Sequence, residues 1–464
     1  MIANRILAEY CAVAGIEHRV AEASFHLESQ AETLPSRLAT TELATGAVAA
    51  VAVSAKALAD VRGSAADAGW VVDPRRVAAS NRGDQLLRRD GEPFPSFAPL
   101  SGFFRTRDGW LRTHANYAHH RERLITALGL GESADRPALE ARLTQLDSIE
   151  AEELIRSHQG IAAAVRTPEE WRSHPQSAAA AKLPLVAIDH LGDAPPHHFP
   201  SSATDPLRPA AGLRVLDLTR VIAGPVATRT LALLGADVLR IDSPHMPEIV
   251  AQHLDNGMGK RSALLDLRES DQLAILTQLL AEADIVVTGY RPHALDDFGL
   301  DPATLAAAHP GLVVASLDAW GPSGPWGAHR GFDSIVQAAS GISVLESKGD
   351  APGALPAQAL DHATGYLLAA GVLQALRRQA SEGRSWHVHA HLARTAHSLL
   401  AISDPDAPPA GPQLDLADCM AEQQTDAGSL RYPLPTLTTR AHPLDYPSVG
   451  GAWGTDQPTW RHRN

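Results

Sequence analysis

The residue with the clearest chemical potential is Asp361, in the run Asp361-His-Ala-Thr-Gly365. An apolar stretch that begins at Tyr366 follows this run and predicts a helix. A carboxylate at a helix N-terminus accepts hydrogen bonds from the free N–H groups there, so Asp361 could be a simple N-cap. The same place also suits a nucleophilic carboxylate, because N–H groups would stand nearby to stabilise developing charge. The residues alone leave both interpretations open.

Three closely spaced histidines form a second candidate site, in Trp386-His-Val-His-Ala-His391. Alternate side chains of a strand point to the same face, which would bring His387, His389 and His391 together. Three imidazoles could bind zinc. The chain has 22 histidines in all, so a solvated strand edge is the interpretation that we favour, and we predict no metal site.

The turn after Leu218 is a candidate for dinucleotide binding, with Asp242 in the place of a ribose-binding acid. That chemistry needs closely spaced glycines, so that the pyrophosphate can approach the backbone at a helix N-terminus. This turn has Gly224 alone, followed by Pro225, and we therefore predict no NAD. The sequence also has no HExxH, GxSxG or Walker motif, which argues against zincin, α/β-hydrolase and P-loop chemistry.

Strands and helices alternate through the middle of the chain. Short apolar runs predict strands at 213–218, 236–241, 284–288 and 311–317, and longer patterns predict helices at 226–234, 271–282 and 302–308. Alternation of this kind is typical of a parallel sheet with helices on both faces. We therefore predict an open, Rossmann-like α/β fold. The candidate carboxylate, Asp361, comes after the last of these strands in the sequence.

Two proline-rich stretches divide the 464 residues, one at 193–209 and one at 404–412. Proline lacks an N–H donor and restricts the residue before it, so such stretches interrupt regular structure. We expect three segments: a mainly helical region over 1–200, the α/β domain over 211–400, and a Pro-rich linker with a C-terminal tail over 401–464. Asp108-Gly109, between apolar runs, predicts a hairpin in the first segment.

The first segment also contains an echo of the run around Asp361. Glu42-Leu-Ala-Thr-Gly46 precedes an Ala/Val-rich helix pattern and then Trp70, just as Asp361 precedes a helix pattern and then Trp386. The spacings from acid to tryptophan are 28 and 25 residues. Chance similarity between alanine-rich helices is the alternative. We predict two incomplete tandem copies.

Charge and cysteine content narrow the class of protein. Lys and Arg number 40 and Asp and Glu 53, a net charge of −13, and no basic run offers a patch for nucleic acid or anionic lipid. Cys11 and Cys419 stand far apart, which fits a reducing compartment without disulfides. Arg5 and Glu9 interrupt what would have to be an apolar signal core. We expect a cytoplasmic protein without nucleic-acid or membrane partners.

Several blocks of the middle segment follow one another in a recognisable order. They begin with Gly212-Leu-Arg-Val-Leu-Asp-Leu218 and continue with Lys260-Arg-Ser-Ala-Leu-Leu-Asp-Leu267, Ala283-Asp-Ile-Val-Val287, Arg330-Gly-Phe-Asp333 and the run at Asp361. In this order they resemble the family III CoA-transferases, a superfamily with formyl-CoA transferase, carnitine CoA-transferase and α-methylacyl-CoA racemase. A weaker echo, Phe104-Arg-Thr-Arg-Asp-Gly-Trp110, resembles part of that family's smaller domain.

The resemblance implies a function as well as the family's α/β fold. Asp361 falls on the family's catalytic aspartate, whose carboxylate attacks an acyl-CoA thioester and becomes an aspartyl-CoA thioester through mixed anhydrides. An acyl-CoA and a carboxylic acid are then the substrates, CoA is carried as a thioester without metal or NAD, and a homodimer is possible. The implied CoA-binding residues are Val221, Lys260, Arg261, Tyr290, Arg291 and Arg330.

Two other functions stay open at this stage. An α-methylacyl-CoA racemase would abstract a proton with a histidine directly before Asp333, but Phe332 stands there and has no titratable group. A degenerate CoA-transferase paralogue without activity is the other, because Ser243 and Asp297 replace residues that are often basic in the family. Glu42, at the matching point of the first copy, is either a second carboxylate or a helix cap.

Overall fold

The computed structural model describes residues 4–29, 31–64, 67–95, 97–197, 205–404 and 411–462, and its main sheet has seven strands. Their order is β11 (Arg261–Leu264), β10 (Asp237–Asp242), β9 (Arg214–Leu218), β12 (Ile285–Thr288), β13 (Val313–Asp318), β14 (Ser385–His391) and β8 (Ala187–Gly192). The first six are parallel, and only β8, at one edge, is antiparallel to its neighbour. The predicted open parallel sheet is confirmed.

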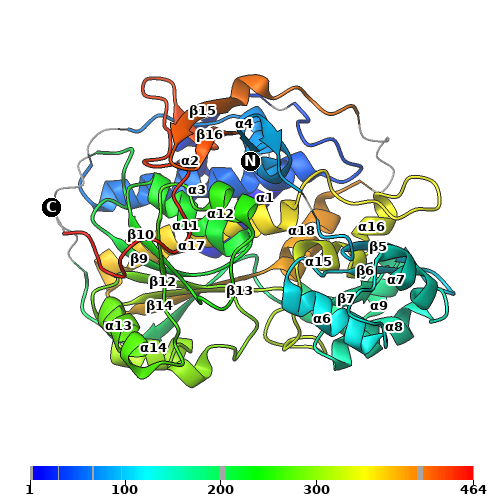
Figure 1. Ribbon diagram of the computed structural model, residues 1–464. Helices are drawn as coiled ribbons and strands as arrows, with labels where there is room; N and C mark the ends of the chain where they lie inside the picture. Colours follow the sequence, from blue (N-terminus) through cyan, green and yellow to red (C-terminus); the bar gives the residue numbers. More distant parts are fainter. Residues whose placement is uncertain are drawn as a thin grey trace.

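Helices cover both faces of this sheet (Figure 1). Alternate strand residues serve the two faces: Val215 packs in one core with α11 (Ala223–Leu233) and α17 (Ala359–Glu382). Leu216 packs in the other with α13 (Ser270–Ala281) and α14 (Pro302–Ala308). Because both faces are buried, the strands are apolar throughout, which is why short apolar runs located them.

The long helices α3 (Thr40–Val61) and α17 pack against each other over much of their length, although almost 300 residues separate them in the sequence. Their lengths match, at 22 and 24 residues. By length and composition α3 could span a membrane, but 78% of its apolar window is buried inside the protein. The helix therefore serves here as a core element of the fold.

Each of the two sheets that follow these helices contains a strand from a distant part of the chain. After α3 the chain forms β2 (Trp70–Val72), which pairs in parallel with β1 (Phe25–Leu27) and antiparallel with β17 (Leu437–Thr439). After α17 it forms β14, which pairs in parallel with β13 and antiparallel with β8. The last strand of the 1–200 segment thus closes the main sheet, while a strand of the C-terminal tail closes the sheet of the first segment. This matching order supports the tandem-copy hypothesis, which stays a prediction.

A smaller layer lies beside the main sheet, at the lower right of Figure 1. Its three antiparallel strands are β5 (Gly102–Arg105), β6 (Trp110–Thr113) and β7 (Ala162–Ala164). They are accompanied by α6 (Ala118–Ala127), α7 (Arg136–Leu143), α8 (Ser148–Ser157), α9 (Pro168–Ser173) and α10 (Pro175–Ala181). The hairpin predicted at Asp108-Gly109 joins β5 to β6 and is confirmed.

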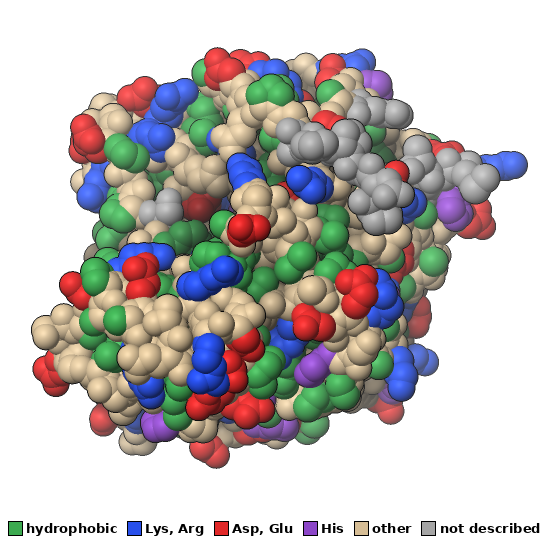
Figure 2. All heavy atoms as spheres, turned by 90° about the vertical axis from the view of Figure 1, so that its right-hand side faces the viewer, with side chains coloured by type: hydrophobic (Ala, Val, Ile, Leu, Met, Phe, Trp, Pro, Cys, Tyr) green, Lys and Arg blue, Asp and Glu red, His purple; other side chains and the backbone are tan. Residues whose placement is uncertain are grey.

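The remaining elements connect these layers. The helices are α1 (Arg5–Ala14), α2 (His18–Ala23), α4 (Pro74–Asn81), α5 (Gly83–Leu86), α12 (Val250–Asn256), α15 (Asp333–Ala339), α16 (Ile342–Leu345), α18 (Leu392–Ile402) and short 3-10 turns at Asp296–Phe298 and Ala417–Cys419. A four-stranded sheet contains β15 (Met420–Thr425), β16 (Gly428–Pro433), β3 (Arg88–Arg89) and β4 (Glu92–Pro93) in that order. Figure 2 shows acidic, basic and hydrophobic side chains intermixed over one face, so the net charge of −13 is not gathered into a single patch there.

Candidate active site

A cavity of about 530 Å³ opens at the carboxyl ends of the parallel strands. Its floor is formed where the chain leaves β9, at Val221, and where it leaves β12, at Tyr290. The strand order reverses between β9 and β12, since later strands extend from β9 to one side and from β12 to the other. Open α/β sheets bind ligands at such switch points. The fold itself therefore marks this cavity as the candidate site.

The opposite wall of the cavity comes from the smaller layer. Helix α6 and the residue before it contribute Tyr117, His119, His120 and Arg123. A second cavity of about 40 Å³ adjoins the first, and the two share five lining residues: Tyr117, Val221, Ile222, Phe332 and Asp361. Asp361 thus lies where a large cavity and a small one meet.

Asp361 is the third residue of α17, and Gln358 is the N-cap, so the N-cap interpretation of Asp361 is wrong. The helix end is capped from elsewhere: a carboxylate oxygen of Asp333 accepts hydrogen bonds from the N–H groups of Leu360 and Asp361, at 2.9 and 3.0 Å. Asp361 is 6% exposed, and within the described ranges no hydrogen bond to its side chain occurs. Its carboxylate is left free for a reaction.

The surroundings of Asp361 favour its neutral form. Burial raises the pKa of Asp361 well above its usual value, and the nearby charge of Asp333 raises it further. Burial also raises the pKa of Asp333, to about 6, although the hydrogen bonds that it accepts lower the pKa. The two acids influence each other and titrate as a pair. A carboxylate of raised pKa is a stronger nucleophile once it is ionised, so perturbation at this place is a mark of a functional site.

Three arginines of the large cavity form a cluster. Arg330 donates to the side-chain oxygen of Gln159 at 2.6 Å, and Arg291 donates to the carbonyl of Pro292 at 3.4 Å. Burial lowers the pKa of Arg330, and the charges of Arg123 and Arg291 lower it further, so the three guanidinium groups repel one another. In the described part of the chain none of the three forms an ion pair with a carboxylate. Such a cluster is arranged to receive an anion.

Part of the chain matches a known family. Residues 210–415 match the model of CoA-transferase family III. This segment is similar to that family. It includes the strands of the switch point, the arginines Arg291 and Arg330, and the acid pair of Asp333 and Asp361, while Arg123 and the small layer lie outside it.

Individual relatives match stretches of this chain that differ in length. An acyl-CoA transferase of Gibberella moniliformis is 29% identical over 74% of this chain and 62% of its own. The alpha subunit of succinyl-CoA–L-malate CoA-transferase from Chloroflexus aurantiacus is 31% identical over 42% of this chain and 51% of its own. A crystal structure of a Mycobacterium tuberculosis protein is 34% identical, with a TM-score of 0.40, over 42% of this chain and 58% of its own. The chain spans less than two thirds of the length of these relatives.

Val221, in the family III segment, is held in an unusual backbone conformation. Its φ is +70°, which a β-branched residue rarely adopts. The N–H of Val221 donates to Glu248 at 3.3 Å, and its carbonyl accepts from the side chain of Asn256 at 3.0 Å. Conformations of this cost persist where the surroundings enforce them, often at binding sites. The predicted contact residue Val221 is thereby fixed at the junction of the two cavities.

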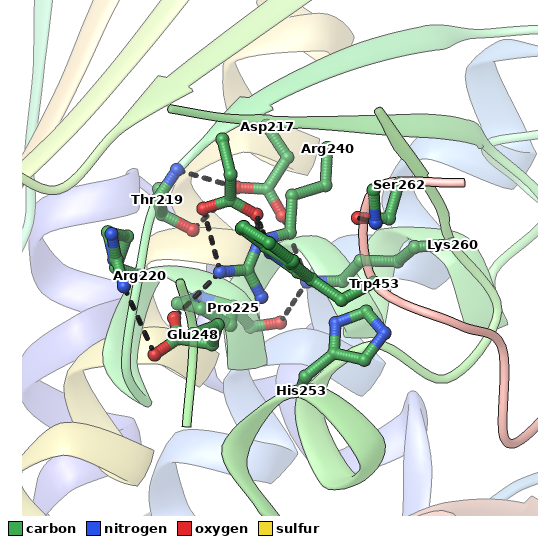
Figure 3. A network of polar contacts seen from close by, with 12 residues as sticks. Asp217, Thr219, Arg220, Pro225, Arg240, Glu248, His253, Lys260, Ser262 and Trp453 are labelled. Atoms are coloured by element: carbon green, nitrogen blue, oxygen red, sulfur yellow. Dashed lines mark hydrogen bonds and ion pairs between the residues drawn. The ribbon is translucent and has the colours of Figure 1, made fainter. Parts of the chain in front are cut away.

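Glu248 belongs to a buried network of charges beneath the cavity (Figure 3). It pairs with Arg240 at 2.7 Å, and its other oxygen accepts from the hydroxyl of Tyr117 at 2.5 Å. Burial would raise the pKa of Glu248, but Arg240 and Arg220 outweigh it and lower the pKa to about 2. The ionised carboxylate thus holds Arg220 and Tyr117, two lining residues, in place.

The structure does not bring Lys260 and Arg261 to either cavity. Lys260, with a side chain 1% exposed, donates to Asp217, the carbonyl of Pro225 and the hydroxyl of Thr228, so all three of its protons are used (Figure 3). Arg261, the first residue of β11, donates to Asp237 and to the carbonyl of Thr459. It lies at the amino end of the strand, whereas the large cavity lies at the carboxyl ends. Both cations are engaged within the fold, and this placement argues against the contact with CoA predicted for them.

The other predicted residues separate into two groups. Val221, Tyr290, Arg291, Arg330 and Asp361 all line the large cavity, as the resemblance implies. Outside it, Glu42 pairs with Arg5 at 2.7 Å and accepts from its N–H, which makes it a structural contact between α3 and α1.

The histidines of β14 do share one side of the strand. They contact Ser316, Asp189 and Asp318 respectively, and the rings of His389 and His391 also bond each other. Within the described ranges, no group of three ligands is arranged to hold a metal ion.

Sequence reasoning missed three residues in and around the candidate site. Asp333 was visible only as part of a family block, and nothing local indicated that it caps a helix 27 residues later. Arg123 lies in His119-His-Arg-Glu-Arg123, where two arginines close together could have indicated an anion site. His114 stacks on Phe332, with ring centroids 3.8 Å apart, and no local pattern connects those two positions.

Proposed function

We propose that this protein is a CoA-transferase that moves CoA from an acyl-CoA to a carboxylic acid through Asp361. One observation carries the proposal: the cavity that contains the free carboxylate of Asp361 also contains the cluster of Arg123, Arg291 and Arg330. CoA combines a reactive thioester with phosphate groups, so a ligand of this type would engage both features at once. The similarity of residues 210–415 to family III supports the same reaction.

The covalent steps need only the carboxylate and the two substrates. An oxygen of Asp361 attacks the thioester carbonyl, the C–S bond breaks, and CoA leaves as a thiolate from a mixed anhydride. The thiolate attacks the aspartyl carbonyl, which releases the first acid and leaves an aspartyl-CoA thioester. The incoming carboxylate attacks that thioester and expels CoA thiolate from a second anhydride. The thiolate then takes the new acyl group, and Asp361 is restored as a carboxylate.

The local charges support each part of this sequence. The arginine cluster supplies the positive field that a polyanionic substrate needs against a net charge of −13. Tyr290, whose pKa is raised by burial to about 12, stays a neutral hydroxyl beside it. Water is limited around the 6%-exposed Asp361, which protects the anhydrides from hydrolysis.

Mass spectrometry of the intact protein after incubation with a panel of CoA esters tests the proposal. We expect a covalent adduct with at least one ester, and none in Asp361→Asn. The matched control is Asp318→Asn, which neutralises the other carboxylate of the large cavity and should still form the adduct. Binding of CoA esters without any adduct across the panel, unaffected by Asp361→Asn, would instead support the inactive paralogue.

A second candidate function rests on one specific observation. His114 and Asp361 line the small cavity together, so an imidazole is present although Phe332 replaces the histidine of the racemase pattern. Proton abstraction from a carbon atom of the acyl group would use this pair. Burial lowers the pKa of His114 to about 3, however, which makes it a weak base. Deuterium exchange at the α-carbon of a branched acyl-CoA distinguishes the two functions, and we expect none.

A further inference from the structure

The small cavity beside Asp361 differs in chemistry from the large one. The large cavity is lined by four arginines, whereas the described lining of the small one contains no lysine or arginine. Aromatic and aliphatic side chains, among them Phe97, Ile249 and Phe332, share the lining of the small cavity with neutral polar side chains. These polar residues are His114, Asn116, Tyr117, Gln252, Ser334 and Gln358. Asp84 and Asp361 are its two acids.

Because Asp361 lies between the two cavities, the two ends of the substrate belong in different cavities. The phosphates of CoA belong with the arginine cluster, so the thioester would reach Asp361 from the large cavity. The acyl group, on the far side of the thioester carbonyl, then continues into the small cavity. We propose that the small cavity is the acyl pocket and that it selects short acids without a second charge. This inference rests on the proposed function and specifies its substrate class.

The size of the pocket limits the acyl chain. Its volume of about 40 Å³ corresponds to roughly three water molecules, so it fits an acyl group of about two to four carbon atoms. One wall is rigid, because the rings of His114 and Phe332 stack in parallel, with an angle of 5° between them. A long chain would have to separate this stack or fold back into the large cavity.

The charges exclude a second carboxylate on the substrate. A dicarboxylate bound at Asp361 would place its far carboxylate in a pocket without a lining cation, and beside Asp84. Burial raises the pKa of Asp84 to about 6, and the charge of Asp255 contributes, so Asp84 is still mostly ionised at pH 7. Two like charges in a buried site repel strongly, and a buried charge without a partner is costly.

Arg112 is the cation that needs separate consideration. Its guanidinium lies against the rings of Phe97 and Phe103, 5.1 and 4.9 Å from their centroids, and is not part of the described lining. Its charge acts on Asp333, which it partly compensates. Phe97, which lines the pocket, lies against Arg112, and Arg112 serves as a counter-charge to Asp333 rather than as an anchor for substrate.

Steady-state kinetics with one CoA donor and a panel of acceptor acids test the inference. The panel is acetate, propionate, butyrate, octanoate, malonate and succinate. We expect kcat/KM for the best short monocarboxylate to exceed that for succinate or octanoate by at least tenfold. Equal or better use of succinate or octanoate would overturn the inference while leaving the proposed function intact. Absence of both turnover and adduct with every donor would instead overturn the proposed function.

Variants of the pocket provide a second test. Ile249→Ala should enlarge it and raise kcat/KM for octanoate relative to propionate at least fivefold, and the matched control Val250→Ala, at a side chain 52% exposed, should not. Asp84→Asn should raise kcat/KM for succinate relative to butyrate. If neither ratio moves, the acyl group does not occupy this cavity. If succinate is preferred and Arg112→Met abolishes that preference, Arg112 is the anchor and the inference is wrong.

Discussion

The carboxylate of Asp333 caps the helix that begins two residues before Asp361, and it does so through the N–H of Asp361 itself, at 3.0 Å. This contact has two consequences. It occupies the helix N–H groups that would otherwise have stabilised an ionised Asp361, and it places a second acid beside the first. The buried side chain of Gln337 also donates to Asp333 and fixes its orientation. Asp333 therefore positions Asp361 and adjusts its protonation.

Asp333→Asn should shift the pH dependence of adduct formation. The nucleophile is the ionised form of Asp361, whose pKa is raised by burial and by the charge of Asp333. Removing that charge lowers the pKa, so the ionised fraction at acidic pH grows and the acid limb of the rate profile moves to lower pH. The rate of adduct formation, measured by mass spectrometry between pH 4 and 8, checks this.

A matched control separates this electrostatic effect from the loss of a helix cap. Asp301 caps α14 through the N–H of Thr304, at 3.0 Å, away from both cavities. Asp301→Asn should change stability by about 1 kcal/mol or less, because asparagine also caps helices, and it should leave the pH profile unchanged. An unshifted profile in Asp333→Asn would show that the two acids do not interact as described.

Arg330→Gln should weaken binding of CoA. Each charge-assisted hydrogen bond contributes about 1.5–3 kcal/mol, so loss of one raises Kd about 10- to 150-fold. The binding should also become less sensitive to salt, since one fewer charge pair forms. Calorimetric titration with CoA measures both effects. Arg268→Gln, at a surface arginine paired with Asp266, serves as the control, and a similar Kd in all three proteins would contradict the cluster's role.

Lys260→Met should destabilise the fold without changing the affinity for CoA. Removing one partner of a buried ion pair leaves Asp217 uncompensated and lowers the free energy of unfolding by about 3–5 kcal/mol. Arg261→Met should also leave the Kd of CoA unchanged within about twofold, a difference of less than about 0.5 kcal/mol. Urea midpoints and calorimetric titration measure the two quantities. A selective loss of affinity in Lys260→Met, with normal stability, would restore its predicted contact with CoA.

His114→Phe should make the protein more resistant to acid. Burial lowers the pKa of His114 to about 3, whereas the unfolded chain has a value near 6.5, so the unfolded state binds the proton first. The free energy of unfolding of the protein with His114 therefore decreases as the pH falls below 6.5, by about 2 kcal/mol at pH 5. Phenylalanine can keep the stack on Phe332 and has no such loss. Urea midpoints at pH 7 and pH 5 compare the proteins, and an equal drop in both would contradict the assignment.

The main sheet could be predicted from the sequence because its strands are buried on both faces. Val215 and Leu216 are adjacent and serve opposite cores, so the run that contains them is apolar throughout and stands out against its flanks. The antiparallel edge strand β8 could not be found in this way, since its outer half, from Asp189 onward, is half exposed or exposed and reads as polar. Its pairing with β14 depends on a chain separation of almost 200 residues.

The site could be predicted where local pattern and chemistry coincide, as at Asp361. Lys260 shows where sequence reasoning fails. A lysine in a family block looks available for a phosphate, but in the folded chain its ammonium group lies 2.9 Å from a carboxylate oxygen of Asp217, and both side chains are buried. Arg123 and His114 come from a layer that only the tertiary fold brings against the main sheet. Residue type alone does not reveal which cations are already paired.

The most direct test of the central claim is borohydride reduction of the protein after incubation with acyl-CoA, followed by peptide mapping. Borohydride reduces an aspartyl-CoA thioester to an alcohol and releases the CoA thiol. We predict reduction at Asp361, dependent on acyl-CoA and absent from Asp361→Asn. Reduction at another carboxylate, or none at all across a broad panel of CoA esters, would contradict the assignment of Asp361 as the nucleophile.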